Sequence, residues 1–174
     1  MRSDKPYILV LDSGAYRHLI EEYIDPEGSE SIIYYPTDNV QGIDISDWIN
    51  QFVGERGMLP SAILSCPIFA DLVLYGDKGK GDGLKSRGFD GSVFLMFNLE
   101  VENYRSLRLL SRDNTPFEVL SASSDLPLQQ RRDTLSNFFT KTLPELLASS
   151  RAGSSSLSTR FSRGSDSTIQ PESR

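Results

Sequence analysis

Five short apolar runs recur along the chain, each bounded by polar, proline or glycine residues. They span 7–11, 32–35, 62–66, 93–97 and 117–120. Short apolar runs without clean alternation are typical of strands that are covered on both faces. The pattern therefore predicts five buried strands.

Between these runs, apolar residues recur at the i, i+3, i+4 spacing of amphipathic helices. The predicted helices span 16–24, 45–53, 69–75, 104–113 and 126–147. Ser13 is the expected N-cap of the first helix, and Gly54 and Gly57 should end the second. Pro144 should kink or restart the last helix in its final turn, because proline donates no backbone hydrogen bond.

Strands that alternate with helices predict an α/β fold with a mostly parallel five-stranded sheet. The expected architecture is a three-layer sandwich that resembles flavodoxin and receiver domains. This single domain should cover residues 5–148. Residues 149–174 hold ten serines and few large apolar side chains, which predicts a disordered Ser/Arg-rich tail.

The formal net charge of −6 is unevenly distributed. The tail carries four arginines against two acids, which leaves the body near −8. An acidic body argues against nucleic acid as the partner, because phosphate binding needs clustered basic residues. One cysteine and no long apolar run indicate a soluble chain in a reducing compartment, so we expect it in the cytoplasm, with no membrane partner.

Ligands of such sheets bind at the carboxyl ends of the strands. The candidate ligand- or metal-binding residues there are Asp12, Asn98 and Glu100, with Asp82 from the preceding loop. Asp12 has a structural alternative to ligand binding, because the turn Asp12-Ser13-Gly14 could cap the following helix. Cys66, after the third strand, is interpreted as a small buried apolar residue.

The segment "PSAILSCP" resembles the third strand of receiver domains, with Cys66 where their phosphoaccepting Asp stands. "FEVLSASSDL" is similar to their last strand, with Ala122 in place of the family's Lys. This resemblance implies a non-catalytic regulatory or protein-interaction module, without a cofactor, whose partner is another protein.

"YILVLDSG" and "FLMFNLEVENY" resemble segments of PIN- and NYN-type nucleases, which hold Mg²⁺ with acids at strand ends. That resemblance implies an alternative, a Mg²⁺-dependent PIN/NYN-like nuclease or another phosphoryl-processing enzyme, which would use Asp12, Asn98, Glu100 and Asp82. A small-ligand or nucleotide sensor in the same crevice is a third hypothesis. Whether the chain is an enzyme stays open at this point.

The glycine-rich stretch "GDKGKGDGLKSRG" at 76–88 does not match a phosphate-binding loop, since Asp82 stands where a Walker A loop has Lys. We expect a flexible lid or a partner-facing loop that presents Lys78, Lys80, Lys85 and Arg87. In the tail, Ser154, Ser162 and Ser165 follow arginines by two or three residues and are candidate phosphosites, with a plain solvated linker as the alternative.

Overall fold

The computed structural model describes residues 4–12, 14, 16–24, 31–36, 42–76, 83–96 and 114–150; it leaves out the side chains of Pro36 and of residues 42–46. The predicted helix over 104–113 and the tail residues 151–174 lie outside this description. The statements that follow concern the described residues.

All five predicted strands are present and form one parallel sheet in the order β2-β1-β3-β4-β5. This is the flavodoxin strand order, so the predicted fold class is confirmed. The strands are β1 (Ile8–Asp12), β2 (Ile32–Pro36), β3 (Ala62–Ser65), β4 (Ser92–Leu95) and β5 (Phe117–Val119).

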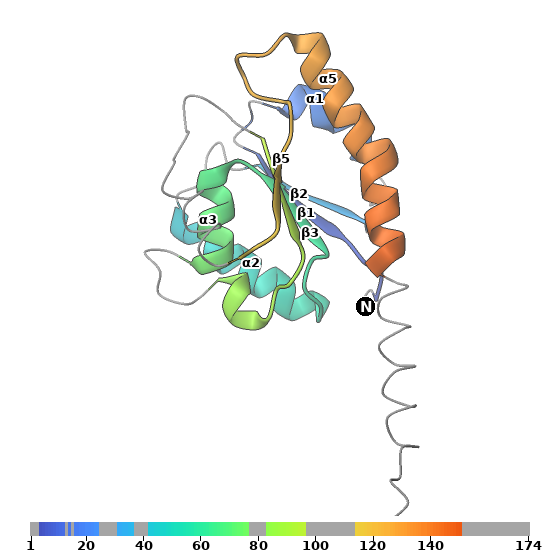
Figure 1. The fold of residues 1–174 in the computed structure, drawn as a ribbon. Helices are drawn as coiled ribbons and strands as arrows, with labels where there is room; N and C mark the ends of the chain where they lie inside the picture. The colour runs from blue at the N-terminus through green and yellow to red at the C-terminus, as the bar shows by residue number, and fades with distance from the viewer. Residues whose placement is uncertain are drawn as a thin grey trace, which may run out of the picture.

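Helices cover both faces of the sheet (Figure 1). One face carries α1 (Arg17–Ile20) with the 3-10 turn η1 (Glu21–Tyr23), and α5 (Leu128–Asn137). The other face carries α2 (Gly42–Arg56) and α3 (Pro67–Tyr75). The three layers of the predicted sandwich are therefore in place.

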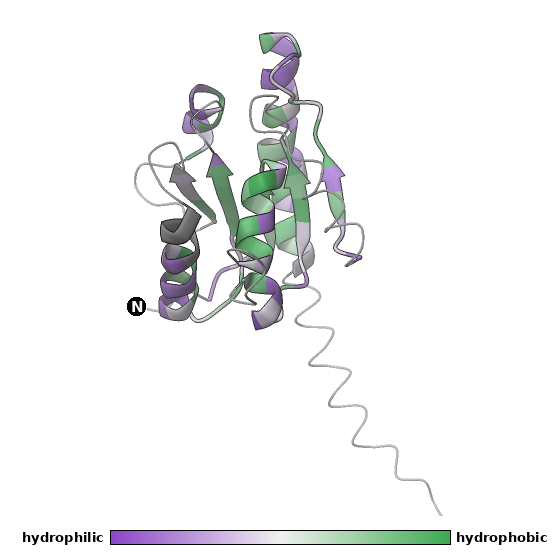
Figure 2. Cartoon of the chain, turned by 90° about the vertical axis from the view of Figure 1, so that its left-hand side faces the viewer, coloured by the Kyte–Doolittle hydropathy of each residue, from purple (hydrophilic) through white to green (hydrophobic). Residues whose placement is uncertain are grey.

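Each central strand sends alternate side chains into two separate cores, as the pleat of a strand requires. In β1, Ile8 and Val10 pack under α1 and α5, whereas Leu9 and Leu11 pack under α2 and α3. The strands and α3 are coloured mainly as hydrophobic in Figure 2. Burial on both faces explains why the strands appear in the sequence as continuous apolar runs.

The end of α2 differs from the predicted one by a few residues. The prediction that Gly54 ends the second helix is wrong, since α2 continues to Arg56. Gly57 ends it with a φ of 79° and an N–H that donates to the Val53 carbonyl at 2.9 Å. Only Gly adopts such a φ without strain, which is why the second glycine is the C-terminal cap.

The last helix continues through Pro144 to residue 150, and its irregular turn lies just before the proline. The π-helical turn η4 (Phe138–Thr142) ends with the Leu143 N–H bonded to the Phe138 carbonyl, five residues back. Thr140 Oγ1 also donates to the Ser136 carbonyl at 2.7 Å. A wide turn leaves room for the proline ring, which would clash with the preceding turn of a regular α-helix.

The described part of the glycine-rich stretch is anchored to α3. The 3-10 turn η3 (Leu84–Arg87) buries Leu84 completely. A Cβ added at Gly83 would lie 2.1 Å from the Leu74 carbonyl oxygen, so only glycine allows this close approach. The turn precedes β4 and therefore sits at the amino ends of the strands, away from the predicted ligand crevice.

Candidate functional site

The strands β1 and β3 are neighbours at the centre of the sheet, and the chain leaves them in opposite lateral directions. Asp12 ends β1, and Cys66 connects β3 to α3. In open α/β sheets the crevice at this switch point is the usual ligand site. The two residues that the sequence singled out at these strand ends thus lie where a ligand is expected.

Asp12 is 2% exposed, and both of its carboxylate oxygens accept hydrogen bonds from within the chain. The Tyr16 N–H donates to Oδ1 at 3.3 Å, and the Tyr34 hydroxyl donates to Oδ2 at 3.1 Å. Burial raises the pKa of Asp12, and these hydrogen bonds and the Arg17 charge oppose that rise. The carboxylate therefore joins β1, β2 and the start of α1. The N-cap of α1 is Tyr16, so the prediction that Ser13 is the N-cap is wrong, and Asp12 bonds to the N–H of the cap residue itself.

Arg17 and Tyr34 extend this network toward solvent. Burial raises the pKa of Tyr34 to about 12, and a hydrogen bond with the Arg17 side chain opposes the rise. The phenol therefore stays protonated at neutral pH and acts as a donor to Asp12. Arg17 thus contacts Tyr34, and Tyr34 contacts Asp12. The Arg17 charge compensates the charge of the buried Asp12 carboxylate.

Tyr16, at the start of α1, is buried close to the loop between β5 and α5. Its side chain is 2% exposed and belongs to the same core cluster as Ala122 of that loop. Burial raises the pKa of Tyr16, the Arg131 charge opposes the rise, and Asp12, Cys66 and Asp125 add to it. The Ser123 hydroxyl donates to the Asp125 carboxylate.

Cys66 is 5% exposed and is not activated as a nucleophile. Burial raises the pKa of its thiol to about 11, and the Asp12 charge adds to the rise, while backbone N–H groups of Phe69 and Ile68 oppose it. At neutral pH the thiol is protonated, whereas nucleophilic cysteines are thiolates. The interpretation of Cys66 as a small buried apolar residue agrees with this environment.

Ser65, next to Cys66, is a second buried polar group that sequence analysis missed. It is completely buried, and within the described residues its Oγ has no hydrogen-bond partner. Its ladder partners are Leu11 and Leu95, which belong to the core under α2 and α3. Its side chain therefore lies on the opposite face of the sheet from the Asp12 network.

The other predicted site residues are not brought to this crevice by the described structure. Asp82, Asn98 and Glu100 lie outside the described residues, as do Lys78, Lys80, Ser154, Ser162 and Ser165. In the described part of the chain, no group of three or more His, Cys, Asp or Glu side chains is placed to hold a metal ion. Lys85 and Arg87 belong to η3, at the other end of the sheet.

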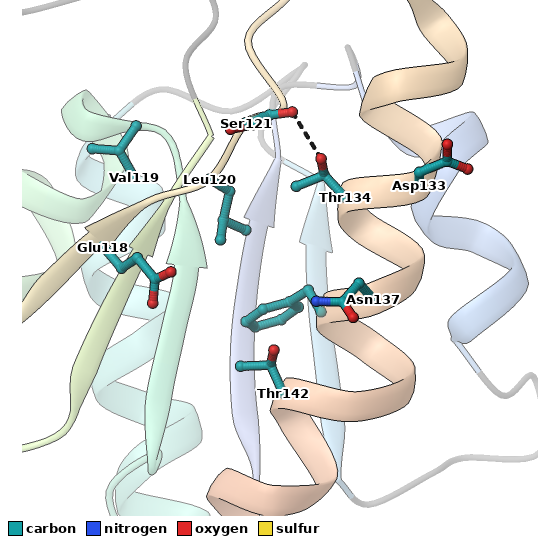
Figure 3. Close-up of a pocket in the computed structure, with 9 residues that line it drawn as sticks. Glu118, Val119, Leu120, Ser121, Asp133, Thr134, Asn137 and Thr142 are labelled. Carbon is teal, nitrogen blue, oxygen red and sulfur yellow. Dashed lines mark hydrogen bonds between the residues drawn. The ribbon is translucent and has the colours of Figure 1, made fainter.

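A groove between β5 and α5 is a further feature that sequence analysis missed (Figure 3). It has a volume of about 410 Å³, and its lining residues are two acids, three with hydroxyl groups, one amide and three apolar residues. The lining residues are Glu118, Val119, Leu120, Ser121, Asp133, Thr134, Asn137, Phe138 and Thr142. A hydrogen bond from Thr134 Oγ1 to the Ser121 carbonyl, 2.9 Å long, closes one end.

None of the helices in the described part of the chain is long and apolar enough to cross a membrane. Comparison of the chain with protein-family models, with curated proteins and with solved structures found no match.

Proposed function

We propose that the chain is a non-catalytic regulatory or protein-interaction module, built on a flavodoxin-type sheet whose strand-end crevice has a structural role. The single observation that carries this proposal is that both carboxylate oxygens of Asp12 are bonded within the chain. Its two carboxylate oxygens accept hydrogen bonds from Tyr16 and Tyr34, and only 2% of the residue is exposed. A carboxylate in this state holds the fold together and offers little to a ligand.

The receiver-like features of the sequence support the same proposal. Cys66 stands after β3, where receivers carry their phosphate acceptor, and its thiol is protonated and buried. Ala122 stands where receivers carry a Lys and is completely buried against the core. A domain that keeps the sheet but lacks these two functional groups would act through its surface.

The two alternatives from the sequence stay predictions. The Mg²⁺-dependent enzyme requires Asp12 to act with Asn98, Glu100 and Asp82, and the last three lie outside the described residues. The small-ligand or nucleotide sensor requires the same crevice to open. In both cases Asp12 would have to give up its bond to Tyr34 or share its oxygens with the ligand.

Thermal unfolding of the full chain tests the proposal against both alternatives. The chain would be heated alone and with Mg²⁺, Mn²⁺, nucleotides or short RNA. A ligand at 100 times its dissociation constant stabilises by about 2.7 kcal/mol, which moves the midpoint by several degrees. The module should show no shift. A shift that disappears in Asp12→Asn and in Glu100→Gln would contradict the proposal and favour the metal site.

A further inference from the structure

The outer edge of β5 presents backbone groups that no described strand pairs with. The Pro116 carbonyl and the Leu120 N–H bond to β4, at 2.9 Å each. Because ladder bonds alternate along a strand, the N–H and C=O groups of Phe117 and Val119 are directed away from β4. β5 is the last of the described strands in the sheet, so within the described residues this edge is open to an additional strand.

Two exposed apolar side chains lie at the same edge. Phe117 is 37% exposed and Val119 49%, and both belong to β5. With Leu128, they are the exposed large hydrophobic residues of the described part of the chain. Single exposed apolar residues are common, whereas neighbouring ones such as Phe117 and Val119 mark contact surfaces.

The two faces of β5 differ in chemistry. Phe117 and Val119 pair with Val93 and Leu95, so they share the face of the sheet that α3 covers. Glu118 points the other way, into the groove toward α5 (Figure 3). Asp133 of α5 is the second acid among the lining residues, and one of its oxygens accepts a hydrogen bond from Gln129 at 2.8 Å. None of the described basic side chains lines the groove.

A strand added beside β5 would place its own side chains alternately on these two faces. Residues on the face of Phe117 and Val119 would meet an apolar surface. The intervening residues would meet Glu118 and the groove, whose two acids favour Lys or Arg. The charge of the body, near −8, draws a basic segment toward the molecule as a whole.

We propose that the β5 edge binds an extended segment of a partner protein as a sixth strand, in which apolar residues alternate with Lys or Arg. Backbone hydrogen bonds to Phe117 and Val119 supply affinity, and the two faces supply specificity, as in other strand-addition complexes. This inference rests on the proposed interaction function and names the surface and the chemistry of its partner.

A direct binding measurement on the full chain tests this inference. The probe is a fluorescein-labelled peptide of about seven residues, which spans about 23 Å as a strand, with Val and Lys in alternation. A matched peptide has Glu in place of every Lys. Fluorescence anisotropy should show saturable binding of the Val-Lys peptide, at least about tenfold tighter than that of the Val-Glu peptide, and weaker at high salt.

Variants at Val119 locate the binding surface. Val119→Pro removes an outward N–H and leaves the bonds to β4, since edge strands tolerate proline. It should lower the affinity at least about tenfold. Where Val119→Pro lowers the unfolding midpoint, Val119→Ser replaces it, because it removes the apolar side chain and keeps the backbone.

The charge is tested by the double variant Glu118→Gln with Asp133→Asn, which should remove the preference for Val-Lys over Val-Glu. Glu145→Gln is the matched control, since Glu145 is an exposed acid of the same helix and does not line the groove. It should bind like the unmodified chain.

Four results would overturn the inference. The first two are no binding of the Val-Lys peptide, and binding that none of the edge variants changes. The third is self-association of the chain that Val119→Pro abolishes, and the fourth is peptide binding that appears only in the double variant Arg160→Glu with Arg163→Glu. The third assigns the edge to a second copy of the chain. The fourth assigns it to the chain's own basic tail. None of these results bears on the ligand-shift test above, so failure of this inference is distinguishable from failure of the proposed function.

Discussion

The strand-end crevice and the β5 edge are two margins of one sheet, and their polar groups differ in burial and in hydrogen bonding. At the crevice, Asp12 is buried, and both of its oxygens are bonded within the chain. At the edge, Phe117 and Val119 are more than a third exposed and direct backbone groups outward. In the described residues, the strand-end position that usually binds ligands in this fold class is filled by bonds within the chain, while the sheet edge, which is usually protected, is exposed.

The difference follows from which layers meet at each margin. At the crevice, α1 starts just after β1: the Tyr16 N–H bonds to Asp12 at the end of β1, and the Tyr16 side chain is 2% exposed. At the edge, α5 lies beside β5 at a distance that leaves the groove of Figure 3. Close packing forces polar groups to pair with each other, whereas an open margin leaves them for a partner.

The largest expected effect concerns the reactivity of Cys66 in the closed crevice. With a pKa of about 11, about one thiol in a thousand is ionised at pH 8. We therefore expect the native chain to react with DTNB more than about a hundredfold more slowly than the same chain in urea. Equal rates in the two states would show that the crevice is open. Asp12→Asn should raise the native rate modestly, because the Asp12 charge contributes to the high pKa.

Removal of the Asp12 carboxylate should be the next largest effect. Asp12→Ala leaves the Tyr34 hydroxyl and the Tyr16 N–H without their acceptor, so we expect a loss of about 2 kcal/mol in the free energy of unfolding. Asp133→Ala at the exposed groove is the matched control and should change stability by less than about 0.5 kcal/mol. Urea unfolding measures both. A similar change in the two variants would remove the distinction between the margins.

The pH dependence of stability should carry the signature of a buried acid. Burial raises the folded-state pKa of Asp12 above 3.8, so the folded chain binds its proton more tightly than the unfolded chain. The extra stability that the protonated form of Asp12 provides is therefore lost as pH rises from about 3.8 through the raised pKa, while its hydrogen bonds remain. The stability of Asp12→Asn relative to the unmodified chain should rise over that window and then stay constant. A difference that falls with pH would mean that the pKa is lowered.

The smallest effect is expected on the fold at the open edge. Val119→Thr should change the free energy of unfolding by less than about 0.5 kcal/mol, because the side chain is about half exposed. Val93→Thr, in the neighbouring strand, buries the same new hydroxyl completely and should cost about 1–3 kcal/mol. Thermal unfolding compares the two. An equal cost would mean that β5 is covered in solution.

The sequence predicted the fold well because burial on both faces leaves a strong local signal. All five apolar runs became strands, and Gly57 ended α2 as a helix C-terminus predicts. The sheet order was the remaining unknown, and the flavodoxin-type interpretation was confirmed.

The site was less accessible to sequence analysis, because its contacts depend on register and position. Tyr34 meets Asp12 only because β1 and β2 are paired so that Val10 lies opposite Tyr34 and Asp12 opposite Pro36. The run at 117–120 predicted a buried strand, yet β5 is an exposed edge, and no local pattern records which strand is last in a sheet. The position of Asp12 at a strand end identified it as a candidate, but the sequence did not show that Tyr16 and Tyr34 bond to it.

The π-helical turn in the last helix changes the direction in which all later side chains of that helix point. Each residue advances an α-helix by about 100°, so Leu143 and Leu147 would stand about 80° and 120° away from Leu135 in an unbroken helix. One extra residue in the turn sets both back to within about 20° of Leu135. Both halves therefore face the same core. Loss of one residue from 139–142 would keep this alignment, whereas gain of one would rotate the final turns away, so this helix is asymmetric in its tolerance of deletions and insertions.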